Sequence, residues 1–224
     1  GDNFGCGYFD VNQRRGVRWN TARAFLRPVQ GRPNLAVLTD TRAERLAFDG
    51  RRCTGVHVVR GGRPLRIAAR REVILAAGAV ASPQLLQLSG IGPGALLQSL
   101  GVPVLHELRG VGANLQDHLQ LRMAFKVQGV RTLNTLANNP LAKLGMAMQY
   151  LFTRSGPLTM SPSQLGAFAR SDRRQPRPNV EYHVQPLSLE KFGEPLHPFP
   201  AFTASVCNLR PTSRGSITAR SADP

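Results

Sequence analysis

The chain has 224 residues, of which 42% are hydrophobic, so it can build one or two domains with a real apolar core. It carries 29 basic and 13 acidic side chains, a formal net charge of +16. No apolar run reaches the roughly 18 residues that cross a membrane, and the cysteines lack metal-binding spacing. We therefore expect no metal, and free thiols in a reducing compartment.

The large positive charge is typical of proteins that bind nucleic acid or anionic membranes. Arginine supplies most of it, in scattered pairs such as Arg51-Arg52 and Arg70-Arg71, with few aromatic rings between them to stack on bases. We therefore expect a solvated basic surface and no nucleic-acid partner. A basic binding module without catalysis is the alternative function.

The first half of the chain is predicted to mix strands and helices, beginning with a short helix at 21–26. Turns are predicted at Asp49-Gly50 and Gly61-Gly62. The predicted strands are 35–39, 44–48, 55–60, 65–69 and 73–77. The last of these is continuously apolar, as in a strand buried on both faces of a parallel sheet. A helix should follow, with Ser82 as its N-cap and Pro83 at its first position, and then a second helix at 93–100.

The second half is predicted to form an antiparallel sheet with one helix. The helix spans 141–152, where apolar residues recur at helical spacing. The predicted strands, separated by proline-rich connections, are 121–127, 164–170, 180–185, 202–209 and 216–220. The sequence therefore predicts a mixture of α/β and α+β structure, with one domain at 1–118 and another at 119–224.

Small residues mark the passage from the predicted strand 73–77 to the helix after it. Ala76, Ala77 and Gly78 would let the backbone approach a nucleotide closely, beside a helix amino terminus that attracts phosphate. The alternative interpretation is tight packing of the strand on the helix, which requires the same small residues.

Other polar residues are weaker candidates. Asp117 and His118 are adjacent, and adjacent side chains of an extended chain point to opposite sides, so we expect no direct catalytic role. Glu181 and His183 share the polar face of strand 180–185 and would contact a substrate if that face lines a cavity; the alternative is a half-solvated face. Ser82 lacks the Gly-x-Ser-x-Gly context of a nucleophile, and an N-cap explains it.

Segment 78–92 has a further regularity: Gly and a small residue, then Ser-Pro, two aliphatic residues and Ser-Gly-Ile-Gly at fixed spacing. This pattern resembles the second signature of the glucose–methanol–choline (GMC) oxidoreductases, flavoenzymes that oxidise alcohols. The resemblance extends over essentially the whole chain and looks most like the choline-dehydrogenase branch. The other similar segments are 16–28, 34–39, 110–118 and 209–215.

The resemblance implies a partial FAD-binding domain of Rossmann type with a β-meander, followed by an antiparallel-sheet substrate domain. It implies FAD contacts at Ala43, whose backbone would read the adenine edge, at Ala76, Ala77 and Gly78, and at Asn114, in a segment that crosses between the domains. It also implies hydride transfer from an alcohol, choline or another primary alcohol, to the flavin, and leaves the electron acceptor open.

Two parts of the family pattern are absent from this sequence: the opening strand–GxGxxG–helix unit and the closing segment with a catalytic His. Asp10 stands where a third glycine would follow Gly5 and Gly7. We interpret the chain as an internal fragment, inactive alone, with the catalytic residues beyond Pro224. We expect a cytoplasmic bacterial parent, leave membrane association open, and expect exposed strand edges to favour oligomers.

Overall fold

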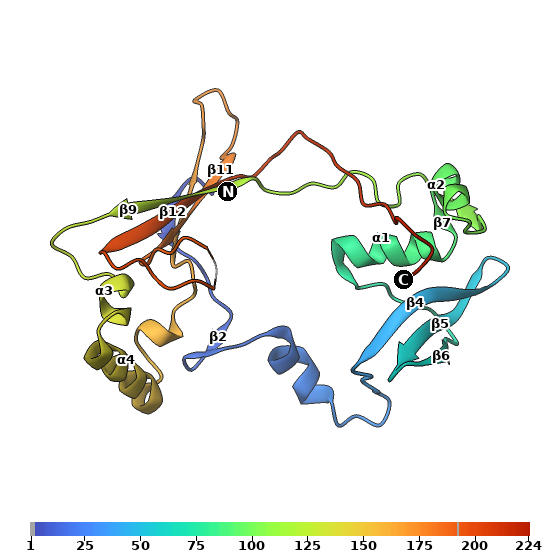
Figure 1. Ribbon diagram of the computed structural model, residues 1–224, viewed down its shortest axis with the longest axis horizontal. Coiled ribbons are helices and arrows are strands. Elements are labelled where there is room, and N and C mark those ends of the chain that lie inside the picture. The colour runs from blue at the N-terminus through green and yellow to red at the C-terminus, as the bar shows by residue number, and fades with distance from the viewer. Residues whose placement is uncertain (1–2, 192) are drawn as a thin grey trace. The chain divides into compact units, whose positions relative to one another are not determined.

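The computed structural model describes residues 3–191 and 193–224, and these form two compact units (Figure 1). The first unit contains residues 3–35 and 118–211, and the second contains 36–117 and 212–224. The predicted boundary between 118 and 119 lies beside the crossing at Asp117–His118. The predicted domains, 1–118 and 119–224, are two continuous segments. The two units differ from them, because each unit combines two separate stretches of chain.

A five-stranded antiparallel sheet forms the centre of the first unit, in the order β1-β10-β11-β12-β9. Four of the strands confirm predictions to within one residue. The short strand β1 was not predicted, because Gly-Cys-Gly-Tyr shows no alternation of apolar and polar residues. The strands are β1 (Gly5–Tyr8), β9 (Gln120–Lys126), β10 (Leu165–Ala169), β11 (Val180–Gln185) and β12 (Ala201–Asn208).

Two helices accompany this sheet, α3 (Leu133–Ala137) and α4 (Pro140–Thr153), and α4 confirms the predicted helix. The Asn139 side chain caps α4 by accepting hydrogen bonds from the N–H groups of Leu141 and Ala142, at 2.9 and 3.1 Å. Arg154 ends α4 in the left-handed conformation. The shorter elements of this unit are β2 (Gln13–Arg14), β3 (Val17–Arg18), η1 (Ala22–Leu26), η2 (Arg27–Val29) and η3 (Pro157–Thr159).

The second unit contains a three-stranded antiparallel meander of β4 (Thr41–Asp49), β5 (Arg52–Arg60) and β6 (Arg63–Ala68). Its hairpin turns lie at the predicted places, and Gly50, Gly61 and Gly62 all have positive φ there. The predicted strand at 35–39 is wrong: those residues form no strand. The rest of the unit includes α1 (Gly78–Leu88), β7 (Ile91–Gly92), α2 (Gly94–Ser99) and β8 (His106–Glu107).

The predicted buried strand at 73–77 is also wrong. These residues pair with no strand in the described part of the chain, and Ile74 is 79% exposed. An apolar run becomes a buried strand only where neighbouring strands satisfy its backbone and other elements cover both its faces. Helix α1 also begins at Gly78, four residues before the predicted N-cap at Ser82, so Pro83 lies inside the helix.

The carboxyl-terminal stretch of the second unit runs beside α1 (Figure 1). The predicted strand at 216–220 is not formed. Instead, a single antiparallel bridge joins Gly215 to Leu115, and the N–H of Ile217 donates to the carbonyl of Gly112 at 2.7 Å. Among the described residues no helix is both long and apolar enough to cross a membrane.

Candidate functional site

A cavity of the second unit lies at the amino-terminal half of α1 and has a volume of about 480 Å³. One wall is α1 itself, and the other is the loop 111–116, with Ile217 completing the lining. Most of its lining is apolar or backbone. This combination is typical of a site for a ring system or for part of a dinucleotide.

The amino end of α1 is arranged to receive a negatively charged or hydrogen-bonding group. Gly78 turns the chain into the helix with φ of +84°, and the first turn contains no acidic residue. Ser82 lines the cavity, and its hydroxyl accepts a hydrogen bond from the N–H of Ala77 at 3.1 Å. Pro83 has no N–H to donate to the carbonyl of Ala79, four residues earlier. The helix terminus therefore presents unpaired backbone groups and a partial positive charge next to the cavity.

A buried amide holds the opposite wall. Gln87 is fully buried; its Nε2 donates to the carbonyls of Ile217 at 3.0 Å and Val111 at 3.4 Å, and its Oε1 accepts from the N–H of Ala219 at 2.7 Å. Gly112 adopts φ of +82°, and a Cβ there would collide with the carbonyl of Ile217. The loop, the carboxyl-terminal stretch and α1 are thus locked together by one side chain and one glycine.

Among the predicted cofactor residues, Asn114 lines this cavity, and Ala76, Ala77 and Gly78 precede a residue that does. Ala76, Ala77 and Gly78 lead into α1 and are exposed, and the next residue, Ala79, lines the cavity. Asn114 lines it from the other side, with φ of +60°. Ala43 is not among the lining residues: it lies on β4, opposite Val58, beside a register shift. Its role in reading adenine stays a prediction.

Glu181 and His183 lie in the first unit, on β11, and their side chains approach each other to 3.4 Å. Their shared face of the strand is largely covered: the side chains are 16% and 29% exposed, and the ring of Phe9 lies 5.3 Å from that of His183. Contact with substrate stays a prediction for both residues. The predicted non-catalytic pair Asp117 and His118 is exposed where the chain passes between the units.

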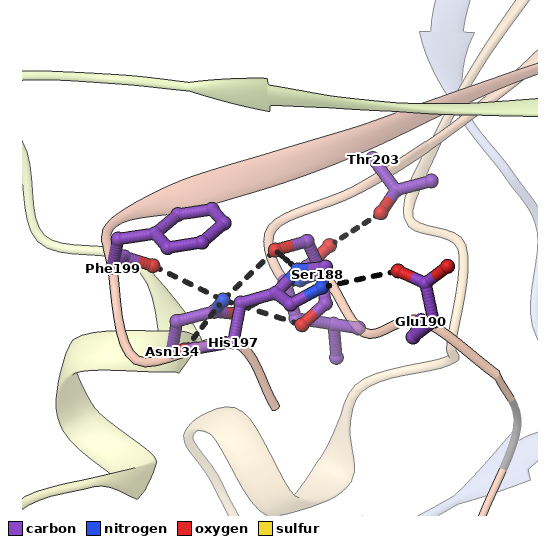
Figure 2. A network of polar contacts seen from close by, with 7 residues as sticks. Asn134, Ser188, Glu190, His197, Phe199 and Thr203 are labelled. Carbon is purple, nitrogen blue, oxygen red and sulfur yellow. Dashed lines mark hydrogen bonds and ion pairs between the residues drawn. The ribbon is translucent and has the colours of Figure 1, made fainter. Parts of the chain in front are cut away.

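Sequence reasoning missed a polar network in the first unit (Figure 2). Asn134 on α3 is fully buried; its Oδ1 accepts from the N–H of Ser188 at 2.8 Å. Four oxygens surround its Nδ2 within 3.2 Å: the carbonyl and hydroxyl of Ser188 and the carbonyls of His197 and Phe199. These partners are 54 to 65 residues away in sequence, so no local pattern could have revealed them.

The same network contains a Ser–His–Glu arrangement. Ser188 Oγ lies 2.9 Å from Nδ1 of His197, whose Nε2 lies 3.6 Å from Glu190. A nucleophilic serine must be reachable by its substrate. Ser188 is fully buried, and its hydroxyl already accepts a hydrogen bond from Asn134. The arrangement therefore secures the connection between β11 and β12 and is not a hydrolase centre.

The other side chains that could bind a metal or act as a nucleophile form no further site among the described residues. Within the described residues, no three of the His, Cys, Asp or Glu side chains are grouped so as to hold a metal ion. Burial raises the pKa of the Cys207 thiol, and the charge of Glu181 acts in the same direction, while a hydrogen bond with Gln120 opposes the shift. Cys207 is therefore an uncharged, buried thiol and not an activated nucleophile.

One unit has a cavity at a helix amino terminus, and it is joined in the same chain to an antiparallel-sheet unit. This combination fits the class of flavin-dependent oxidoreductases. The particular family follows from comparison with known proteins. The chain belongs to the GMC oxidoreductases, whose family model matches residues 1–120.

Similar proteins agree with this assignment. The chain is 38% identical over 213 residues to an oxygen-dependent choline dehydrogenase of Burkholderia ambifaria, covering 94% of this chain and 37% of that protein. It is 36% identical over 223 residues to an alcohol dehydrogenase [acceptor] of Pseudomonas putida, covering 98% of this chain and 40% of that one. The chain thus spans well under half the length of these curated relatives.

Solved structures show the same fold. Formate oxidase from Aspergillus oryzae, the subject of a study of FAD modification, superimposes with a TM-score of 0.86 at 26% identity, covering 98% of this chain and 43% of the oxidase. A pyridoxine 4-oxidase superimposes with a TM-score of 0.78 at 26% identity, covering 98% of this chain and 39% of the oxidase. The fold is therefore that of a GMC flavoenzyme, and the predicted family and fold class are confirmed.

Proposed function

We propose that this chain is the central portion of an FAD-dependent enzyme, called here the parent enzyme, that oxidises a primary alcohol, choline or another, at its CH–OH carbon. The observation that carries the proposal is the cavity between the amino end of α1 and the loop 111–116, in a chain of the GMC family. A bound flavin supplies the hydride acceptor. The group that takes the hydroxyl proton is expected beyond Pro224.

The amino end of α1 and the loop that faces it across the cavity support a contact with part of FAD. Ala76, Ala77 and Gly78 present little side-chain bulk, and a Cβ placed on Gly78 would meet no other atom within 4 Å, so there is open space beside the backbone. The amino terminus of α1 favours a phosphate or a ring oxygen. Asn114 offers a polar side chain from the facing wall. We assign the contacts with the ribityl–pyrophosphate part of FAD to these residues, and the adenine contact to the backbone of Ala43.

The first test is Gly78→Val in the parent enzyme. A branched side chain would fill the space beside the backbone, and flavin content should fall about tenfold, which corresponds to roughly 1.4 kcal/mol of binding. Gly101→Val is the matched control, because Gly101 also has positive φ and open space around it but lies at the end of α2, away from the cavity. Equal flavin content in both variants would refute the assignment, provided circular dichroism shows both folded.

We also propose a substrate contact for Glu181 and His183, which requires part of their covered face to open in the parent enzyme. Their side chains, 3.4 Å apart, support a shared polar patch. Glu181→Gln should raise the KM for the alcohol with little change in flavin content. An unchanged KM would remove both residues from the site.

For location, we propose a cytoplasmic parent enzyme that touches the membrane surface through α4. The exposed face of α4 is apolar, whereas Ala142, Met146 and Tyr150 are only half-exposed on the opposite side. No acidic residue occurs between Asp117 and Asp172, so the surroundings of α4 suit an anionic lipid surface. The exposed apolar residues are Leu141, Leu144, Met148, Leu151 and Phe152.

Vesicle flotation tests this location. The parent enzyme should float with vesicles that contain anionic phosphatidylglycerol, and Leu144→Ser combined with Leu151→Ser should abolish flotation. Leu65→Ser is the control, an exposed leucine on β6. Flotation that persists in the double variant would refute the role of α4. Light scattering of the same samples reports whether the exposed edges β1 and β9 pair into an oligomer.

A basic binding module remains the alternative function, and net charge alone supports it. The flavin spectrum separates the two: a purified parent enzyme without flavin bands, retained on a nucleic-acid column with a steep salt dependence, would favour the alternative.

A further inference from the structure

The strands β11, β12 and β9 are neighbours in the five-stranded sheet (Figure 1), and Ser205 lies on the middle one. The register places Ser205 directly opposite His183 of β11 and, on its other side, directly opposite Arg122 of β9. Side chains of directly opposite residues lie on the same face of a sheet. Ser205 therefore shares the face of His183 and Glu181, the two residues that we propose as substrate contacts.

The hydroxyl group of Ser205 is buried and has no partner in the described part of the chain. The residue is 1% exposed, and its Oγ makes no hydrogen bond to any described residue. Most buried polar atoms of native proteins are hydrogen-bonded to the protein or to ordered water, because an unpaired one loses its hydration without compensation. The Ser205 hydroxyl therefore requires a partner that the described residues do not supply.

A second hydroxyl on the same strand shows that the unpaired state is not general on this face. Thr203, two residues before Ser205 and on the same side of β12, is also buried, and its Oγ1 donates to the carbonyl of Leu187 at 2.8 Å. Thr203 thus joins β12 to the connection that covers it. An alanine at position 205 would avoid the cost of burying an unpaired hydroxyl. The hydroxyl of Ser205 accordingly has a role other than packing.

The ring of His183 also has a nitrogen that needs a partner. Its Nε2 lies 3.4 Å from Oε1 of Glu181, and the ring of Phe9 lies 5.3 Å away between ring centres. The other nitrogen, Nδ1, makes no hydrogen bond to any described residue. The hydrogen bond at one ring nitrogen sets which nitrogen carries the proton. In a neutral ring with the proton on Nε2, toward the carboxylate, Nδ1 is an acceptor.

The separation of Ser205 and His183 fits one water molecule between them. Cβ atoms of directly opposite residues lie about 4.5 to 5.5 Å apart, and the hydroxyl forms no direct hydrogen bond to the ring. A bridging water is nearly as favourable as a direct hydrogen bond. Ser205 would donate to the water, and the water to Nδ1 of His183. Arg122, opposite Ser205 on β9, adds a third polar side chain to the same row.

We infer that Ser205 is a positioning residue for His183: its hydroxyl holds one ordered water that donates to Nδ1, so that the Nε2–H group stays directed toward Glu181. The Nε2–H group is then a donor beside the carboxylate acceptor, and an alcohol hydroxyl needs one of each. The inference rests on the proposed substrate contact of Glu181 and His183 and adds the residue that orients the pair. Ser205 itself does not contact the alcohol.

A crystal structure of the parent enzyme tests the water directly. We expect a water oxygen within about 2.7 to 3.2 Å of both Ser205 Oγ and His183 Nδ1. In Ser205→Ala this water should be absent. A Ser205 hydroxyl bonded to a protein group or to a bound alcohol, or one without a water that reaches Nδ1, would overturn the inference.

Steady-state kinetics test the consequence, with whichever of choline, butan-1-ol and benzyl alcohol the parent enzyme oxidises fastest. Ser205→Ala should raise KM about fivefold, the effect of one lost hydrogen bond, with kcat and flavin content close to the wild-type values. Ser205→Thr keeps a hydroxyl and should restore the KM. An unchanged KM in Ser205→Ala would overturn the inference.

Thr203→Val is the matched control, on the same strand and the same face. It removes the hydrogen bond to the carbonyl of Leu187, so it should lower the midpoint of urea denaturation and leave KM unchanged. An equal rise of KM in Thr203→Val and Ser205→Ala would assign the effect to packing of β12 and overturn the inference.

Glu181→Gln separates a failure of the inference from a failure of the proposed function. If Glu181→Gln raises KM and Ser205→Ala does not, the inference is wrong and the substrate contact stands. If neither variant changes KM, the substrate contact is wrong and the inference falls with it. A parent enzyme without flavin would overturn both the proposed function and the inference.

Discussion

Two buried amides hold the two units in shape, and they differ in what lies beside them. Gln87 of α1 binds backbone groups 130 and 132 residues away, and the nearer of these residues, Ile217, lines the cavity. Asn134 of α3 binds the connection between β11 and β12 with the same chemistry, but no residue of that network lines the cavity. Both should matter for stability, and only Gln87 should matter for the cofactor.

The largest effect is expected for Gly112→Ala, next to Gln87. The new Cβ would collide with the carbonyl of Ile217 at a positive φ, so we expect a loss of about 4 kcal/mol in the free energy of unfolding, measured by urea denaturation. Gly129→Ala is the control for positive φ alone, because its Cβ would meet nothing within 4 Å. Its loss in the free energy of unfolding therefore contains no contribution from a collision. Equal losses in the two variants would show that the loop is not locked against Ile217.

Asn134→Leu should cost about 3 kcal/mol, because it leaves several buried acceptors and the N–H of Ser188 without a partner. Flavin content should stay at the wild-type level. The control, Asn138→Leu, removes a single exposed hydrogen bond to the carbonyl of His197 and should cost about 0.5 kcal/mol. A loss of flavin in Asn134→Leu, at a temperature where the protein is folded, would contradict the claim that only Gln87 matters for the cofactor.

Gln87→Leu should cost about 2 kcal/mol of stability and, unlike Asn134→Leu, should weaken flavin binding about tenfold, because the wall 111–116 loses its support. Gln98→Leu on α2 is the control, an exposed glutamine whose loss should change neither quantity. Flavin fluorescence titration supplies the affinity. An unchanged affinity would mean that the loop holds its shape without the amide.

The smallest effect concerns pH. Because burial raises the pKa of Cys207 above its usual 9.0, the folded state holds the thiol proton more tightly than the unfolded state does. The stability that this provides is fully present below the pKa that the Cys207 thiol has in the unfolded chain. It is lost as the pH rises through the pKa that the thiol has in the folded protein. Urea denaturation above pH 9 should show a decline of roughly 1 kcal/mol per pH unit, and Cys207→Val should remove that decline. A parallel decline in Cys207→Val would assign it to other groups.

Patterns that depend on neighbours in sequence were predicted well. Alternation and Gly-rich turns gave the meander β4–β6, and helical spacing gave α4. The strand at 73–77 could not be judged from its own residues, because an apolar run forms a strand only when another strand supplies its hydrogen bonds.

For the candidate site, the small residues 76–78 predicted a cofactor contact at the amino end of α1, beside which the cavity lies, and the resemblance added Asn114, which lines it; the contacts themselves stay predictions. Neither could reveal Gln87, which occupies a position that the signature leaves free and whose partners Ile217 and Ala219 are distant in sequence. Long-range polar contacts of this kind leave no local periodicity, so the contact between Asn134 and Ser188 could not be predicted from the sequence either.

Flavin retention by Ala79→Trp tests the central claim most directly. Ala79 lines the cavity from the first turn of α1, so an indole there would occupy the space assigned to the cofactor. The parent enzyme carrying Ala79→Trp should purify without the absorption bands of oxidised flavin, while Ala95→Trp, at an exposed position of α2, keeps them. A folded Ala79→Trp enzyme with full flavin content would contradict the assignment of this cavity to FAD.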